Sequence, residues 1–118
     1  MKRTVLAIKN RLVLEAVANA LKKAGFFVEK SASQEKDKIL SLTSALFANM
    51  LIMDVARAGD GAFDARMDTV KDAKKQSPEM KIALLCDNVS DENTAYKVKC
   101  AKEEGEIDAF FYESVPSD

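Results

Sequence analysis

The stretch Met50-Leu51-Ile52-Met53-Asp54 decides the fold of this chain. Four consecutive apolar residues are typical of a strand that is buried on both faces of a sheet. Because a charge is costly inside a core, an acid at the end of such a strand is either a terminator that touches water or the working group of a site. In open α/β folds, ligands gather where parallel strands end, so Asp54 is the first candidate site residue.

Strand-like segments alternate with helical segments on both sides of this stretch. The sequence predicts strands over residues 4–8, 26–30, 50–54, 81–86 and 107–112, and helices over 12–24, 35–47, 63–75 and 90–104. Such alternation with short connections predicts one α/β domain, residues 1–118, built on a doubly wound parallel sheet of five strands. A fifth helix is expected to be absent or truncated, because Val115-Pro116-Ser117-Asp118 would begin one and nothing follows.

The composition is that of a globular protein with no bias toward nucleic acid or lipid. Of the 118 residues, 47% are hydrophobic and 31% charged, and 18 basic against 19 acidic residues give a net charge of -1. Such a chain has no overall attraction for phosphate backbones or anionic lipid, so neither nucleic acid nor a membrane is expected as a direct partner. No stretch reads as a signal peptide or a membrane span, which predicts a cytoplasmic location. The sequence has no histidine, the commonest metal ligand and general base.

The pattern of strand ends resembles the receiver domain of two-component response regulators, a flavodoxin-like module. The resemblance covers nearly the whole chain and rests on the strand ending at Asp54, the loop with Asp60-Gly61, the strand followed by Asp87, and the last strand, 108–112. It implies a signalling domain of a phosphorelay, with Asp54 in the position of the phospho-acceptor and with no enzymatic turnover of its own. It also implies a protein partner, either a sensor kinase or an effector domain, or a second copy of the chain.

Four supporting positions depart from the receiver pattern. Receivers hold magnesium with an acidic pair after the first strand, and here those positions are Lys9 and Asn10. The lysine at the end of the last strand is replaced by Glu113. The hydroxyl at the end of the fourth strand is replaced by Cys86, whose thiol is a weak donor. With one carboxylate in place of three, we expect no magnesium and no other cofactor.

Lys9 suggests what could replace the metal ion. An ammonium group near Asp54 would favour the ionised carboxylate, which gives the hypothesis of a permanent Lys9–Asp54 ion pair extended to Glu113. The alternative is that the Lys9 side chain lies in solvent. For Cys86, a small buried hydrophobe is favoured over a reactive thiol, and for Asp87 a turn residue is favoured over a metal ligand.

These features predict a degenerate receiver that acts by protein–protein interaction, with magnesium-dependent phosphorylation impaired. Two alternatives stay open. The first is a functional phospho-acceptor that uses Asp54, and the second is a small-ligand-binding domain of the flavodoxin-like fold. Against the second, no glycine-rich phosphate loop follows the first strand, where Lys9-Asn10-Arg11-Leu12 stands.

Overall fold

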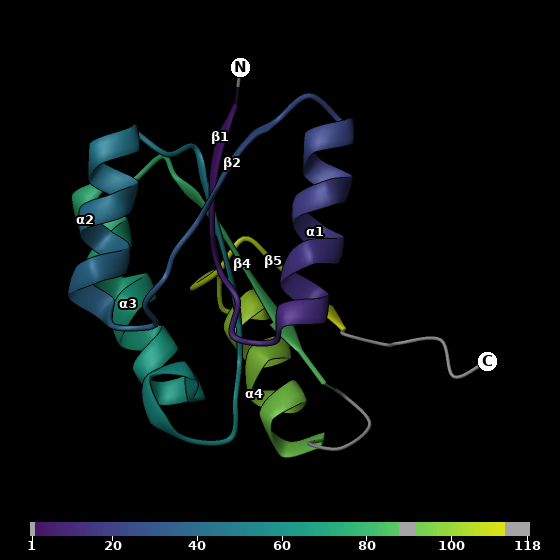
Figure 1. The fold of residues 1–118 in the computed structure, drawn as a ribbon. Helices are drawn as coiled ribbons and strands as arrows, with labels where there is room; N and C mark the ends of the chain where they lie inside the picture. Colours follow the sequence, from purple (N-terminus) through teal and green to yellow (C-terminus); the bar gives the residue numbers. More distant parts are fainter. Residues whose placement is uncertain (1, 88–91, 113–118) are drawn as a thin grey trace.

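A parallel sheet of five strands forms the centre of the computed structural model, which describes residues 2–87 and 92–112 (Figure 1). The strands are β1 (Arg3–Ala7), β2 (Phe27–Lys30), β3 (Met50–Asp54), β4 (Lys81–Cys86) and β5 (Ala109–Tyr112). The helices are α1 (Arg11–Lys23), α2 (Lys36–Leu46), α3 (Phe63–Gln76) and α4 (Glu92–Glu103), with a 3-10 turn, η1 (Gly59–Gly61), before α3. The five predicted strands and four predicted helices are confirmed in their order. The first residues of the helix predicted from 90, and the expected absence or truncation of a fifth helix after 112, lie outside the described residues.

The strand order is β2-β1-β3-β4-β5, with every neighbouring pair parallel. This is the flavodoxin-like order, so the predicted doubly wound α/β fold is confirmed. In the register, Ala7 of β1 lies beside Met53 of β3, and Asp54 lies beside Leu85 of β4. Asp54 therefore stands one residue beyond the end of β1, at the carboxyl edge of the central strands.

The helices divide between the two faces of the sheet. Figure 1 shows α1 on the opposite side of the sheet from α2 and α3, as right-handed crossovers in this strand order require. Alternate side chains of each strand point to opposite faces, which gives two cores. The larger core joins the sheet to α2, α3 and α4, and the smaller one joins it to α1 through Ala18.

Asn10 fixes the connection between β1 and α1. Its side-chain Oδ1 accepts hydrogen bonds from the amides of Leu12 at 3.0 Å and Val13 at 3.3 Å, which makes it the N-cap of α1. An N-cap residue has an extended backbone, and Asn10 has φ -71° and ψ 114°. The backbone of Lys9 and Asn10 therefore turns sharply at the carboxyl edge, next to the end of β3.

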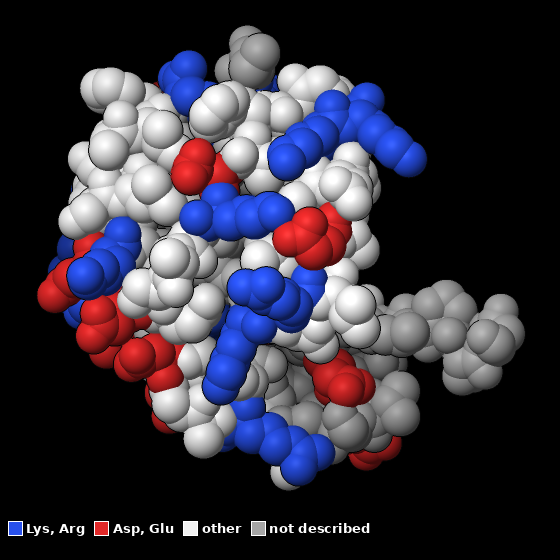
Figure 2. Space-filling model, in the orientation of Figure 1, with Lys and Arg blue, Asp and Glu red and all other residues white. Residues whose placement is uncertain are grey.

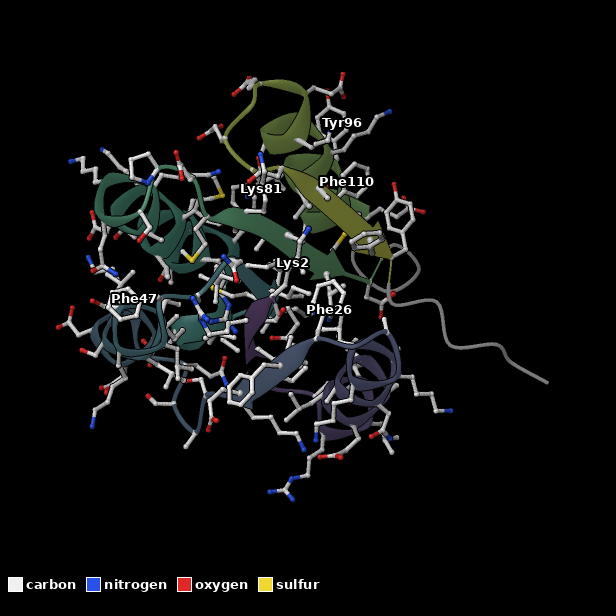
Figure 3. The ribbon with its side chains drawn as sticks, turned by 90° about the horizontal axis from the view of Figure 1, so that it is seen from above. Lys2, Phe26, Phe47, Lys81, Tyr96 and Phe110 are labelled. Carbon is white, nitrogen blue, oxygen red and sulfur yellow. The ribbon has the colours of Figure 1, made fainter. Side chains whose placement is uncertain are left out.

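The opposite edge, where the strands begin, carries an ion pair from α3. Lys74 Nζ lies 2.7 Å from Asp108 Oδ2, and the same oxygen accepts the amide of Ile82 at 2.8 Å. Figure 3 looks onto this edge, with Lys2 and Lys81 over the strands and Phe47 and Phe26 on either side of them. No helix in the described part of the chain is long and apolar enough to cross a membrane.

Candidate functional site

Asp54 is a buried carboxylate held by the backbone of the β1–α1 connection. The residue is 5% exposed. The amide of Lys9 donates to Oδ1 at 3.0 Å and to Oδ2 at 3.1 Å, and the amide of Asn10 donates to Oδ2 at 3.2 Å. Both oxygens of Asp54 are thus engaged by the loop that follows β1.

The cation beside Asp54 is Arg66, from the first turns of α3. Its Nη2 lies 3.1 Å from Asp54 Oδ1, and the two side chains are 0% and 7% exposed. Its Nε donates to the backbone oxygen of Asp54 at 2.8 Å, and Nη2 donates to that of Ala7 at 3.0 Å. Arg66 therefore neutralises the carboxylate and also ties the ends of β1 and β3 together.

Two further groups complete the surroundings of the guanidinium. The side-chain Oε1 of Gln34, in the connection between β2 and α2, accepts from Arg66 Nη2 at 2.5 Å, and Met53 Sδ lies 3.9 Å from Nη1. Burial lowers the pKa of Arg66, and the neighbouring Asp54 carboxylate opposes that shift. A guanidinium stays protonated in proteins, so this is a buried ion pair with most of its polar groups satisfied.

The predicted Lys9–Asp54 ion pair is wrong. Lys9 meets Asp54 only through its backbone amide among the contacts of the described residues, and its side chain is exposed, as in the alternative stated above. The position of the counter-ion is already taken by Arg66, whose planar guanidinium reaches the carboxylate and two carbonyl oxygens at once. The predicted extension of the pair to Glu113 lies outside the described residues.

The remaining candidates occupy different positions around this edge. Cys86 is fully buried at the end of β4, with Sγ 3.8 Å from the backbone oxygen of Phe111, which is the small buried hydrophobe that the sequence favoured. Asp87 is half-buried directly after β4. Asp60 is exposed in η1, within the loop after β3 on which the receiver resemblance partly rests. Asn10 serves the site through its amide and its capping side chain.

The magnesium ion that the receiver resemblance implies does not fit these residues. Magnesium needs several oxygen ligands, whereas the groups aimed at Asp54 are two backbone amides and a guanidinium, all of them hydrogen-bond donors. In the described ranges, no group of three or more His, Cys, Asp or Glu side chains is arranged to hold a metal. The site is built to surround one carboxylate with donors.

Sequence reasoning missed Arg66 and Gln34. Arg66 shares the buried stripe of α3 with Val70 and Ala73, at spacings of four and three residues, so it occupies a position where an apolar residue is expected. The signal that could have found Arg66 is a basic residue on the buried stripe of the helix that follows β3, the strand that ends in a buried acid. Gln34 lies in a polar loop and gave no comparable signal.

Known proteins resemble this chain in fold but not detectably in sequence family. No protein-family model matches the sequence, and the search of curated proteins gives no match. Among solved structures, a CheY-like response regulator receiver domain from Methanospirillum hungatei is 21% identical, with a TM-score of 0.70, over 98% of this chain and 83% of that one. The response regulator TrrA from Thermotoga maritima, in complex with Mg²⁺ and BeF, is 17% identical, with a TM-score of 0.72, over 100% of this chain and 91% of that one.

A third similar structure belongs to a family of redox sensors in the streptococci that evolved from two-component response regulators. It is 19% identical to this chain, with a TM-score of 0.74, over 98% of this chain and 45% of that one. The chain has the CheY-like receiver fold. Sequence identities this low establish the fold alone, so the activity has to be argued from the site.

Proposed function

We propose that this chain is a receiver-type signalling domain of a two-component system that acts by protein–protein interaction, with Arg66 in place of the receiver's metal ion. The observation that carries the proposal is the buried Arg66–Asp54 pair, in which Nη2 and Oδ1 are 3.1 Å apart. Phosphoryl transfer depends on positioning and on a cation that neutralises the developing charge. Here the cation is the guanidinium of Arg66, which is part of the protein and is already paired with the Asp54 carboxylate.

The contacts of Asp54 disfavour its phosphorylation. An attacking carboxylate needs a free oxygen lone pair and room for the incoming group, but Asp54 is 5% exposed and both oxygens accept hydrogen bonds. An acyl phosphate would carry roughly 1.5–2 negative charges at neutral pH in place of the single charge of the carboxylate. It would also displace the amides of Lys9 and Asn10 from the carboxylate. The domain is therefore proposed not to be switched by phosphorylation at this edge and to signal through its surface.

The partner is proposed to be a protein, either a sensor kinase or an effector domain, with a second copy of the chain as the alternative. The large exposed apolar side chains, which favour protein contact, are Leu12, Phe27, Phe47, Tyr96, Phe111 and Tyr112. Sedimentation velocity over a range of protein concentrations separates self-association from binding to another protein. No catalytic turnover and no cofactor are part of this proposal.

A functional phospho-acceptor is the second candidate, because Asp54 does end β3 at the carboxyl edge of the sheet. Magnesium with beryllofluoride mimics the phosphorylated state, and acetyl phosphate donates a phosphoryl group. We expect neither to change the amide spectrum of the protein nor to add mass to it. A mass gain of one phosphoryl group that is lost in Asp54→Asn, or saturable shifts of the Lys9 and Asn10 amides with beryllofluoride, would establish phosphorylation instead.

A further inference from the structure

A polar cavity adjoins the Asp54 site on the side of α1 and β2. It has a volume of about 580 Å³ and lies between the β1–α1 connection, the first turn of α1 and the β2–α2 connection. The residues that define its chemistry are Lys9, Arg11, Glu15, Lys30, Ser31 and Gln34. Pockets of about 300–1,000 Å³ accommodate small molecules. This cavity is large enough for a ligand of that class.

The charges around the cavity are unbalanced. Glu15 Oε1 lies 2.7 Å from Lys30 Nζ, so that acid is already paired with one of the three cations. In the part of the chain that the structure describes, neither Lys9 nor Arg11 has a carboxylate within ion-pair distance. The first turn of α1 carries no acidic residue. Two unpaired cations on a chain whose net charge is -1 mark this place as locally positive.

Figure 2 shows the same feature on the molecular surface. Basic side chains with an acidic one between them gather near the middle of the face, around the place where Figure 1 shows α1 beginning. Basic side chains also stand together at the upper right of this face, and at its left edge the two signs are mixed. The geometry of three basic groups around one cavity favours a ligand that carries at least two negative charges close together, which is the chemistry of a phosphate group.

Two residues connect the cavity to the buried ion pair. The Lys9 side chain lines the cavity, while its backbone amide donates to both oxygens of Asp54. Gln34 also lines the cavity, while its Oε1 accepts from Arg66 Nη2. A ligand that contacts both side chains would therefore act on Lys9, which binds Asp54, and on Gln34, which binds Arg66.

We infer that this cavity binds a small phosphate-bearing molecule, and that its occupancy is transmitted to the Asp54–Arg66 pair through Lys9 and Gln34. Binding of the ligand does not depend on the proposed function. The transmission to the Asp54–Arg66 pair rests on the proposed function, because it would supply an input to a site that phosphorylation does not reach. Ser31 and Gln34 supply neutral hydrogen-bonding groups that orient the ligand beside the three cations.

Sodium pyrophosphate, titrated into the ¹⁵N-labelled protein with EDTA at constant ionic strength, tests the binding. We expect saturable shifts of the Lys9, Arg11, Ser31 and Gln34 amides. The double variant Lys9→Ala/Arg11→Ala should weaken binding by about tenfold or more, because charge-assisted hydrogen bonds to phosphate are among the strong ones. The control Lys22→Ala/Lys23→Ala removes the same charge from the other end of α1 and should leave the affinity unchanged.

Three outcomes overturn the inference. They are shifts that do not saturate, the same shifts with sodium chloride, and equal loss of affinity in both double variants, since each indicates general screening of surface charge. ADP in place of pyrophosphate separates a nucleotide ligand from a free polyphosphate, and tighter binding of either supports the inference.

The transmission has its own test. In the wild-type protein, pyrophosphate should also shift the Arg66 Nε–H signal. At saturating pyrophosphate, Gln34→Ala should reduce that shift, while the shifts at Arg11 still report the bound ligand. An Arg66 signal that ignores bound pyrophosphate refutes the transmission. Because EDTA removes divalent metal, this experiment is independent of the magnesium–beryllofluoride experiment, so the failure of either proposal can be told from that of the other.

Discussion

Helix α3 is held to the sheet at both ends by a basic residue paired with an aspartate, and the two pairs differ mainly in burial. Near its start, Arg66 pairs with Asp54 at the carboxyl edge, with side chains that are 0% and 7% exposed. In its last turn, Lys74 pairs with Asp108 at the opposite edge, with side chains that are 29% and 32% exposed. Each aspartate also accepts at least one backbone amide. The same chemical unit therefore serves twice in different surroundings.

The comparison separates a surface clamp from a component of the site. Water screens the Lys74–Asp108 pair, and pairs of this kind contribute about 0–1 kcal/mol. The Arg66–Asp54 pair has lost its water, so removing one partner leaves an uncompensated charge and costs roughly 3–5 kcal/mol. A lysine is a point charge on a flexible stem, whereas the planar guanidinium of Arg66 also fixes the positions of two strand ends.

The largest effect is expected for Arg66→Met. The variant keeps a side chain that can fill the space but leaves Asp54 buried without a counter-ion, so the free energy of unfolding should fall by roughly 3–5 kcal/mol. Urea denaturation at neutral pH measures it. The double variant Asp54→Leu/Arg66→Met removes both charges and should recover part of the loss. Equal losses in the single and double variants would mean that the two residues are not coupled.

A smaller effect is expected for Gln34→Ala. It removes one acceptor of a guanidinium that keeps Asp54 and Ala7 as partners, so the loss of stability should be about 1–2 kcal/mol. Gln76→Ala is the matched control, because Gln76 donates to the Leu40 backbone oxygen from an exposed position. Its cost should stay within about 0.5 kcal/mol. If the two glutamines cost the same, Gln34 is not part of the buried network.

At the other end of α3, Lys74→Met should cost at most about 1 kcal/mol, because its pair with Asp108 is partly exposed. Lys75→Met is the control, since Lys75 is exposed on the same turn and has no ion pair in the described residues. A cost for Lys74→Met comparable to that for Arg66→Met would contradict the distinction between the two ends.

The smallest expected effect is the dependence of stability on pH through Asp108. Burial opposes ionisation of Asp108, but the hydrogen bond from Lys74, together with the Ile82 amide, outweighs it and lowers the pKa of Asp108 below its usual value of 3.8. The unfolded chain then binds more protons at this residue, so this contribution is present above pH 3.8 and is lost as the pH falls through the lower, folded pKa. Urea unfolding between pH 7 and pH 3 measures this contribution. The free energy of unfolding should fall less steeply with decreasing pH in Lys74→Met than in the wild-type protein, and an identical fall in both would refute the role of the Lys74–Asp108 pair.

Much of the fold could be predicted from the sequence because its pattern is local. The apolar run of β3 and the helical spacing of α1 each report their own element, and alternation of elements fixes a parallel sheet. The prediction that the fifth strand begins at 107 was less accurate. Ile107 is buried, but β5 begins at Ala109, and the side chain of Asp108, just before it, accepts from Ile82 and Lys74.

The site was predicted only in part, since its decisive contacts are not local. Asp54 was found because a strand end can be read from the sequence. Whether Lys9 or Arg66 is the counter-ion of Asp54 depended on the orientation of Lys9. Its backbone amide, and not its ammonium group, points to the carboxylate, so the counter-ion is Arg66. That orientation follows from the N-capped turn at Asn10, whose geometry no residue type fixes alone.

The most direct test of the central claim is a magnesium titration that follows the Arg66 Nε–H and the Lys9 and Asn10 amide signals by NMR. If Arg66 takes the place of the metal ion, these signals stay unchanged through millimolar magnesium, and the Arg66 Nε–H stays protected from exchange with solvent. Saturable shifts of the three signals, together with faster exchange at Arg66, would show that magnesium displaces the guanidinium and would contradict the account.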